Sequence, residues 1–206
     1  MKKLFVTFAL ATIAVGAFAQ GSLTYQNTLG VGKEKFIFQP DPSNPTVAKN
    51  GGVAADYAGF AKVDGTTYSA ELYYGAEGAA EDSLKAVAGS LVGFRTGTTA
   101  GLLNGKSKLD IANTKGGQKL TLQLRVWSNA GGMDTWEKAL GSATTAKGKS
   151  GLFVHELAGI GEDGSPKLGD GNMAKNLQMF SLTVPEPSVV ALGALGLGAL
   201  LLRRRK

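Results

Sequence analysis

The chain has 206 residues, with 22 Lys and Arg, 16 Asp and Glu, and no cysteine. The absence of cysteine excludes disulfides, thiol nucleophiles, zinc–thiolate sites and iron–sulfur clusters. The excess positive charge lies mainly at the two chain ends, because residues 20–184 contain 16 basic and 15 acidic residues. This near-neutral interior has no stripe of cations with interleaved aromatic residues, so we predict that the protein does not bind nucleic acid.

The first 19 residues have the pattern of a secretory signal peptide. Two lysines follow Met1, a mostly apolar run extends over residues 4–16, and Ala17-Phe18-Ala19 precedes Gln20. A cationic start, a short apolar run and small residues before the cut are the features of such a peptide. The run is too short for an ordinary membrane span. We therefore expect export through the Sec translocon, with cleavage by signal peptidase between Ala19 and Gln20.

Residues 20–184 predict one all-β domain. Short segments rich in β-forming residues alternate with turns rich in Gly, Ser, Thr and Asn, a pattern typical of a β-sandwich or jelly roll with one or two short helices. The predicted strands cover residues 22–27, 34–40, 67–74, 120–128, 151–157 and 177–184.

Three local predictions concern turns and helices. Residues 58–75 are expected to form a hairpin, because Asp64-Gly65 supplies the positive φ angles of a tight turn. Short helices are expected within 81–88 and 134–140. In the second, Asp134 is a suitable N-cap because Glu137 follows three residues later.

Aromatic residues raise the possibility of sugar binding. The strand over residues 120–128 alternates in polarity, and Trp127 lies on its more polar face. Exposed there, Trp127 would offer a flat apolar surface to a sugar ring, as would Tyr73 and Tyr74. Buried under a loop or a second sheet, the same rings would only be core. The sequence leaves both interpretations open, and Trp136 belongs to the same candidate group.

Catalytic groups are sparse in the sequence. His155 is the only histidine, and Glu156 beside it points to the opposite face of a strand, so we expect a structural or surface role. The acidic pairs Glu81-Asp82 and Glu162-Asp163 are interpreted as a helix-start charge and a solvated loop. We predict no enzymatic activity and no cofactor. A hydrolase whose carboxylates come together only in the fold is a further alternative.

The loop over residues 161–172 contains oxygen-bearing side chains of the kind that hold calcium. It lacks the spacing of an EF-hand, so we interpret it as a hydrophilic loop and predict no metal site. The side chains in question are those of Glu162, Asp163, Asp170 and Asn172.

The C-terminus combines three elements in fixed order. Pro185-Glu186-Pro187-Ser188 comes first, then an apolar run over residues 189–202, then Arg203, Arg204, Arg205 and Lys206. As a helix the run would be about 21 Å long, shorter than the hydrocarbon core of a bilayer, which is about 30 Å thick. The terminal cations prefer the cytoplasmic side and thus direct the domain outward.

This tail resembles the PEP-CTERM sorting signal of exported proteins from Gram-negative bacteria. The resemblance implies recognition by exosortase, a membrane-embedded cysteine-dependent protease or transpeptidase. Exosortase would remove the tail and release or transfer the protein to the cell surface or the extracellular matrix, after an intermediate in the inner membrane. A permanent single-pass anchor is the alternative.

Segments of the interior are similar to a group of small PEP-CTERM proteins from Verrucomicrobia-like bacteria. That group implies no activity that can be carried over to this chain. We therefore expect a non-enzymatic structural or interaction component of the cell surface or exopolysaccharide matrix, with a carbohydrate-binding module as the alternative. The similar segments are residues 21–27, 70–84, 94–101, 124–140 and 150–157.

Overall fold

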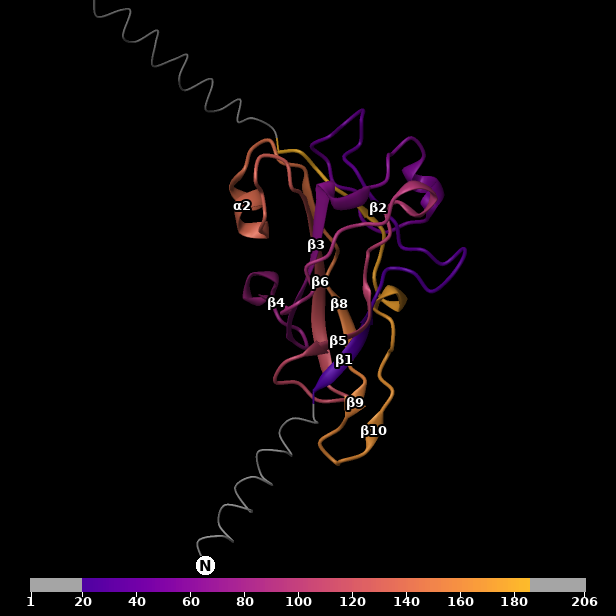
Figure 1. Ribbon diagram of the computed structural model, residues 1–206, viewed down its shortest axis with the longest axis vertical. Coiled ribbons are helices and arrows are strands. Elements are labelled where there is room, and N and C mark those ends of the chain that lie inside the picture. The colour runs from indigo at the N-terminus through magenta and orange to yellow at the C-terminus, as the bar shows by residue number, and fades with distance from the viewer. Residues whose placement is uncertain (1–19, 186–206) are drawn as a thin grey trace, which may run out of the picture.

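The structure is a computed structural model that describes residues 20–185 (Figure 1). The predicted signal peptide, with Ala17 and Ala19, lies outside the described residues, as does the chain from Glu186 onward. Strands and loops dominate the described part and helices are short, which confirms a β-rich domain. The remaining residues of the predicted sorting signal also lie outside the described range: Pro187, Ser188, Arg203, Arg204, Arg205 and Lys206.

Eleven strands and one α-helix are defined among these residues, together with five short 3₁₀ helices. The α-helix is α2 (Trp136–Gly141). The 3₁₀ helices are η1 (Ala54–Tyr57), η2 (Gly65–Thr67), η3 (Glu81–Ser83), η4 (Gly97–Thr99) and η5 (Met173–Lys175). The strands are β1 (Gly21–Tyr25), β2 (Ile37–Phe38), β3 (Tyr68–Ala76), β4 (Lys85–Ala86), β5 (Lys106–Ile111), β6 (Lys119–Ser128), β7 (Lys147–Lys149), β8 (Phe153–Glu156), β9 (Gly159–Ile160), β10 (Pro166–Lys167) and β11 (Phe180–Ser181).

Strand β6 is the centre of a five-stranded sheet (Figure 1). It pairs with β3 in antiparallel register from Tyr68↔Ser128 to Ala76↔Leu120. Its other edge is shared, since β8 pairs with its first half and β7 with its second half. β4 extends the sheet beyond β3. The alternating β-forming residues of β6 thus specify the longest strand of the domain.

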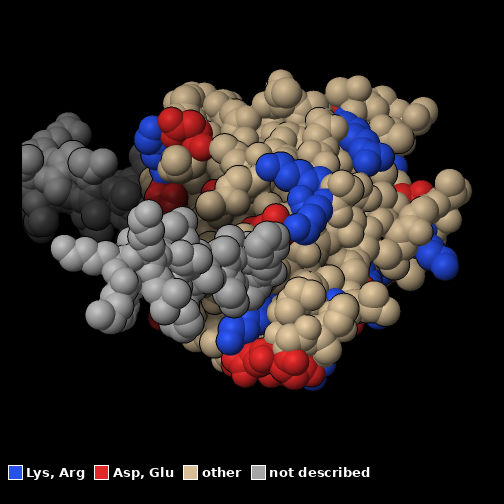
Figure 2. Space-filling view, turned by 60° about the horizontal axis from the view of Figure 1, so that its bottom comes forward, with Lys and Arg blue, Asp and Glu red and all other residues tan. Residues whose placement is uncertain are grey.

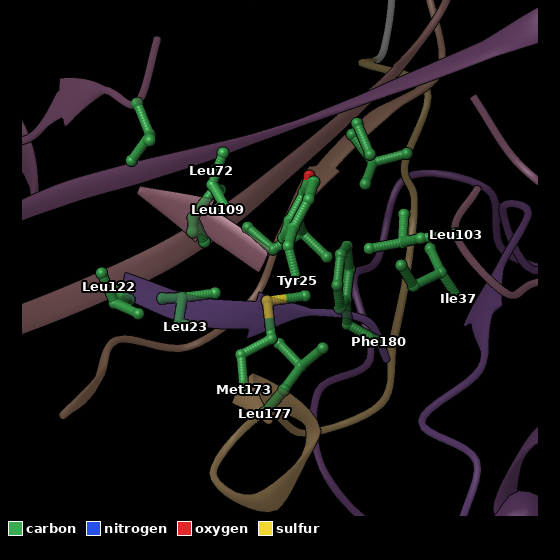
Figure 3. Packing of buried hydrophobic residues seen from close by; sticks show 14 of the residues in the cluster. Leu23, Tyr25, Ile37, Leu72, Leu103, Leu109, Leu122, Met173, Leu177 and Phe180 are labelled. Atoms are coloured by element: carbon green, nitrogen blue, oxygen red, sulfur yellow. The ribbon is translucent and has the colours of Figure 1, made fainter. Parts of the chain in front are cut away.

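Three smaller strand pairs complete the β structure. β1 and β5 are antiparallel, β2 and β11 are parallel, and β9 and β10 are antiparallel. The main core lies where β1, β2 and β11 face the five-stranded sheet. Figure 3 shows the converging side chains, among them Leu23, Tyr25, Ile37, Leu72, Leu122 and Phe180.

Both faces of β6 are buried, not one. Its second face, which carries Gln123, Arg125 and Trp127, is as inaccessible as the core face. α2 covers this side, and the Trp127 and Trp136 rings meet edge-to-face at 6.3 Å. The alternation of polarity in β6 therefore does not mark a solvated face.

The predicted hairpin over residues 58–75 is wrong. Gly65 does adopt a positive φ of 62°, but it begins η2 rather than a two-residue turn. Before it, Lys62 bridges to Phe38 of β2, whereas β3 pairs with β6 and β4. The long β6 strand offers β3 more backbone hydrogen bonds than the short segment before Gly65 could supply.

The two predicted helices also differ in detail. Residues 81–88 form only the 3₁₀ turn η3, followed by the short strand β4. In the second helix the N-cap is Thr135, not Asp134, because the Thr135 side chain accepts a hydrogen bond from the Lys138 backbone N–H. Asp134 instead forms an exposed ion pair with Lys138.

Removing core volume from β6 tests its central position. Leu124 is fully buried in the main core, so Leu124→Ala is expected to lower the free energy of unfolding by about 2–5 kcal/mol. Urea denaturation measures this change. The matched control is Leu140→Ala on α2, where the side chain is 58% exposed and the expected change is within about 0.5 kcal/mol. Equal effects of the two substitutions would contradict the assignment.

Candidate functional site

Three of the four candidate sugar-stacking rings are buried inside the domain. Trp127 is completely inaccessible, Tyr73 is 4% exposed and Trp136 is 6% exposed. The indole N–H of Trp127 donates to the carbonyl of Met133 at 2.9 Å. Tyr74 is half-buried against the main core. Of the two interpretations that the sequence left open, burial in the core therefore holds for Trp127, Tyr73 and Trp136, which belong to a second apolar cluster beneath α2.

Arg125 is the charged centre of this cluster. Its guanidinium carbon lies 3.9 Å above the Tyr73 ring and 5.5 Å from the Trp136 ring, so two aromatic faces compensate the buried cation. Its Nε donates to Gln123 Oε1 at 2.9 Å, and its Nη2 donates to the Glu81 carbonyl at 3.2 Å. These contacts give Arg125 a packing role and fix η3 over the sheet.

Two carboxylates border the same cluster. The Tyr73 hydroxyl donates to Glu137 at 3.2 Å, and burial, together with the nearby Glu71 charge, raises the pKa of Tyr73. Burial also raises the pKa of half-buried Glu71. Both carboxylates lie beside the Tyr73 ring within a packed cluster. A glycosidase needs two acids that face each other across a substrate cleft, so this arrangement fits a packing role better than a catalytic one.

His155 lies in the core-facing register of β8 and is fully buried. Its Nδ1 is 4.0 Å from Asp170 Oδ2, and neither ring nitrogen has a hydrogen-bond partner in the described structure. Burial lowers the pKa of His155 below its ordinary value. The geometry thus supports a structural role, and the neighbouring charge that sequence reasoning missed is the Asp170 carboxylate.

Asp170 holds a loop against the edge of β8. Its Oδ2 accepts from the Glu156 backbone N–H at 2.9 Å and from the Asn176 side chain at 3.1 Å. The backbone bond from Glu156 is the main reason that the pKa of Asp170 is lowered. Asp170 lies between two glycines, and nothing in this local sequence predicted its contact with Glu156.

The oxygen-bearing side chains of the loop considered for calcium do not converge on one point. Glu162 pairs with Lys115 at 3.0 Å and Asp163 with Lys167 at 2.9 Å. Asn172 caps η5 by accepting from the Ala174 backbone N–H. Within residues 20–185, no group of three His, Asp or Glu side chains gathers in a geometry that fits a metal ion.

The two ends of the domain lie far apart. β1 begins at Gly21, directly after exposed Gln20. At the other end, the Val184 N–H donates to the Pro45 carbonyl at 2.8 Å, and partly exposed Pro185 follows. Figure 1 shows the chain entering beside β9 and β10 and leaving near α2. No helix among the described residues combines the length and the apolar character needed to cross a bilayer.

An open groove of about 510 Å³ lies between the loop after β1 and the segment around η5. Its lining residues include Leu29, Lys33, Lys35, Val53 and Lys175. Cations elsewhere are dispersed: on the face seen in Figure 2 they form separate small groups, several beside acidic side chains.

Comparisons with known proteins identify no family for this chain. A scan against protein-family models, a search of curated proteins and a search of solved structures each found no match.

The burial of Trp127 has a direct test. Trp127→Ala is expected to lower the free energy of unfolding by about 3–5 kcal/mol, because it removes a buried ring. Trp127→Phe keeps a ring and loses the bond to Met133, so its cost is smaller. Urea denaturation compares the two. A Trp127→Ala protein as stable as the parent would show that the ring is not in the core.

His155 makes stability depend on pH. The folded-state pKa lies below the ordinary 6.5, so below about pH 6.5 the unfolded chain binds a proton that the folded chain excludes. The free energy of unfolding therefore falls as pH drops from about 7 to about 5, by up to about 1.4 kcal/mol per pH unit.

The control is His155→Gln measured over the same pH range. Glu71, whose pKa is raised, acts with the opposite sign, since it favours the folded state as the pH falls. The contribution of His155 is thus the difference between the parent and His155→Gln profiles. Parallel profiles would contradict the prediction.

Proposed function

We propose that this chain is an exported protein whose β-rich domain is delivered to the cell surface or extracellular matrix by its C-terminal PEP-CTERM-like signal, with exosortase removing the tail. The role of the domain is structural or interactive rather than enzymatic. The inner membrane is the intermediate location, where the uncut tail holds the protein.

One observation carries this proposal: the fold closes at the two positions where cuts are expected. β1 starts one residue after Gln20, and among the described residues the last backbone hydrogen bond is made by Val184. Pro185 is partly exposed and begins the expected sorting motif. A cut before Gln20 and a cut after Pro185 would leave every described strand intact.

We further infer that the domain is a β-sandwich. The five-stranded sheet forms one layer, and the pairs β1–β5 and β2–β11 form the other. The main core, which takes residues from both, supports this interpretation.

The alternative of a carbohydrate-binding module has lost most of its original support. It depended on Trp127 and on the pair Tyr73-Tyr74, of which Trp127 and Tyr73 are buried and Tyr74 is half-buried. Sugar binding abolished by Trp127→Ala would therefore reflect lost folding as much as a lost contact.

Intact-mass analysis of the protein from its native host tests the proposal. Medium and envelope are analysed separately, and we expect a chain that starts at Gln20 and ends between Pro185 and Pro187. Any added mass identifies what was attached to the new end. The matched variant Glu186→Ala is expected to retain more of the tail and to shift toward the membrane fraction. A parent protein that runs through Lys206 in the membrane would favour a permanent anchor and contradict the proposal.

A further inference from the structure

The loop after β1 presents apolar side chains to solvent. Val31 is 100% exposed, Leu29 is 45% exposed, and Val53 across the groove is 63% exposed. Exposed apolar side chains gathered at one place mark an interaction surface more often than isolated ones do. We call Leu29, Val31, Val53, Lys33 and Lys35 together the apolar–basic surface.

The backbone holds Val31 outward. Thr28 bridges to Glu34, and the Lys33 N–H donates to the Gly30 carbonyl at 3.1 Å, so residues 28–34 form a closed turn. Gly30 and Gly32 have positive φ angles of 117° and 78°. The turn therefore projects Val31 between two glycines, away from the three apolar clusters of the domain.

Charged side chains line the groove beside this turn. Lys33, Lys35 and Lys175 are among its lining residues, as is Glu34, and the Asp56 carboxylate accepts a hydrogen bond from the Val53 N–H at 2.8 Å. Lys175 lies 3.5 Å from Asp170, whereas Lys33 and Lys35 form no ion pair with any residue in 20–185. Lys33 and Lys35 are therefore the cations of this surface that remain for a partner.

We propose that the apolar–basic surface docks on a lipid surface that carries anionic headgroups. Val31 and Leu29 enter the boundary between headgroups and acyl chains, and the lysines contact lipid phosphates. A purely polyanionic partner such as an acidic polysaccharide would pair with the lysines but leave Val31 in water. This inference goes beyond the proposed function, because it concerns the domain surface and not the processing of the tail.

Vesicle co-sedimentation tests the proposal with the protein recovered from the host medium. The probes are vesicles of phosphatidylcholine and vesicles of equimolar phosphatidylcholine and phosphatidylglycerol. We expect stronger binding to the anionic vesicles, weakened by added salt. Val31→Asp is expected to lower the partition coefficient about tenfold. Lys33→Ala with Lys35→Ala is expected to lower it about 25-fold, at about fivefold per lysine.

Two matched variants control for charge and folding. Leu168→Asp introduces the same change at an apolar residue that is 89% exposed outside the groove, and Lys85→Ala removes an exposed lysine of β4. Both are expected to bind like the parent, and all variants are expected to keep the parent's thermal midpoint.

Three outcomes would overturn the proposal. Equal binding to neutral and anionic vesicles is one, and unchanged binding of Val31→Asp is another. The third is retention on immobilised polygalacturonate in preference to anionic vesicles, which would assign the surface to an acidic polysaccharide. The masses of the chain ends do not enter any of these readouts, so failure here is distinct from failure of the proposed processing.

Discussion

The pairing of β6 with β3 is the constraint on which the rest of the domain depends. Nine consecutive residue pairs join the two strands, and the sheet that they form is covered on both faces. On one side Leu122 and Leu124 pack into the main core, and on the other Trp127 packs under α2. Because β6 has no solvated face, every element that covers it must be held in place by specific contacts.

Those contacts are supplied by buried cations as well as by apolar side chains. The Lys147 ammonium donates to the carbonyls of Ala139, Leu140 and Ser142 at 2.6–3.1 Å, and thereby satisfies the C-terminal end of α2. Burial lowers the pKa of this lysine, so its charge is retained against a desolvation penalty. Arg125 donates to the Glu81 carbonyl and so holds η3 against β6. Polar residues of β6 and β7 thus hold α2 and η3 against the face of the sheet that lies away from the main core.

The sequence predicted the positions of the strands better than their pairing partners and the elements that cover them. Alternation located β6, and β-forming residues located β1, β3 and β8 within a few positions. It indicated short helical segments near residues 81–88 and 134–140, but it could not show that they cover the polar face of β6, because that packing depends on contacts between distant residues. The same limit left the surroundings of Trp127 undecided. Strand partners were also hidden, since Asp64-Gly65 satisfies the local rule for a hairpin while β3 pairs with a strand about fifty residues away.

The proposed site differs from the predicted one for the same reason. Polarity within a strand cannot reveal burial by distant residues, whereas exposure in a short turn depends mainly on local backbone bonds. Leu29-Gly30-Val31-Gly32-Lys33 closes on itself and leaves Val31 in solvent. If exosortase removes the tail, the protein also loses its strongest attachment to a membrane. A turn that carries two apolar residues and adjacent lysines would then supply a weaker and reversible one, which links the chemistry of this surface to the fate of the C-terminus.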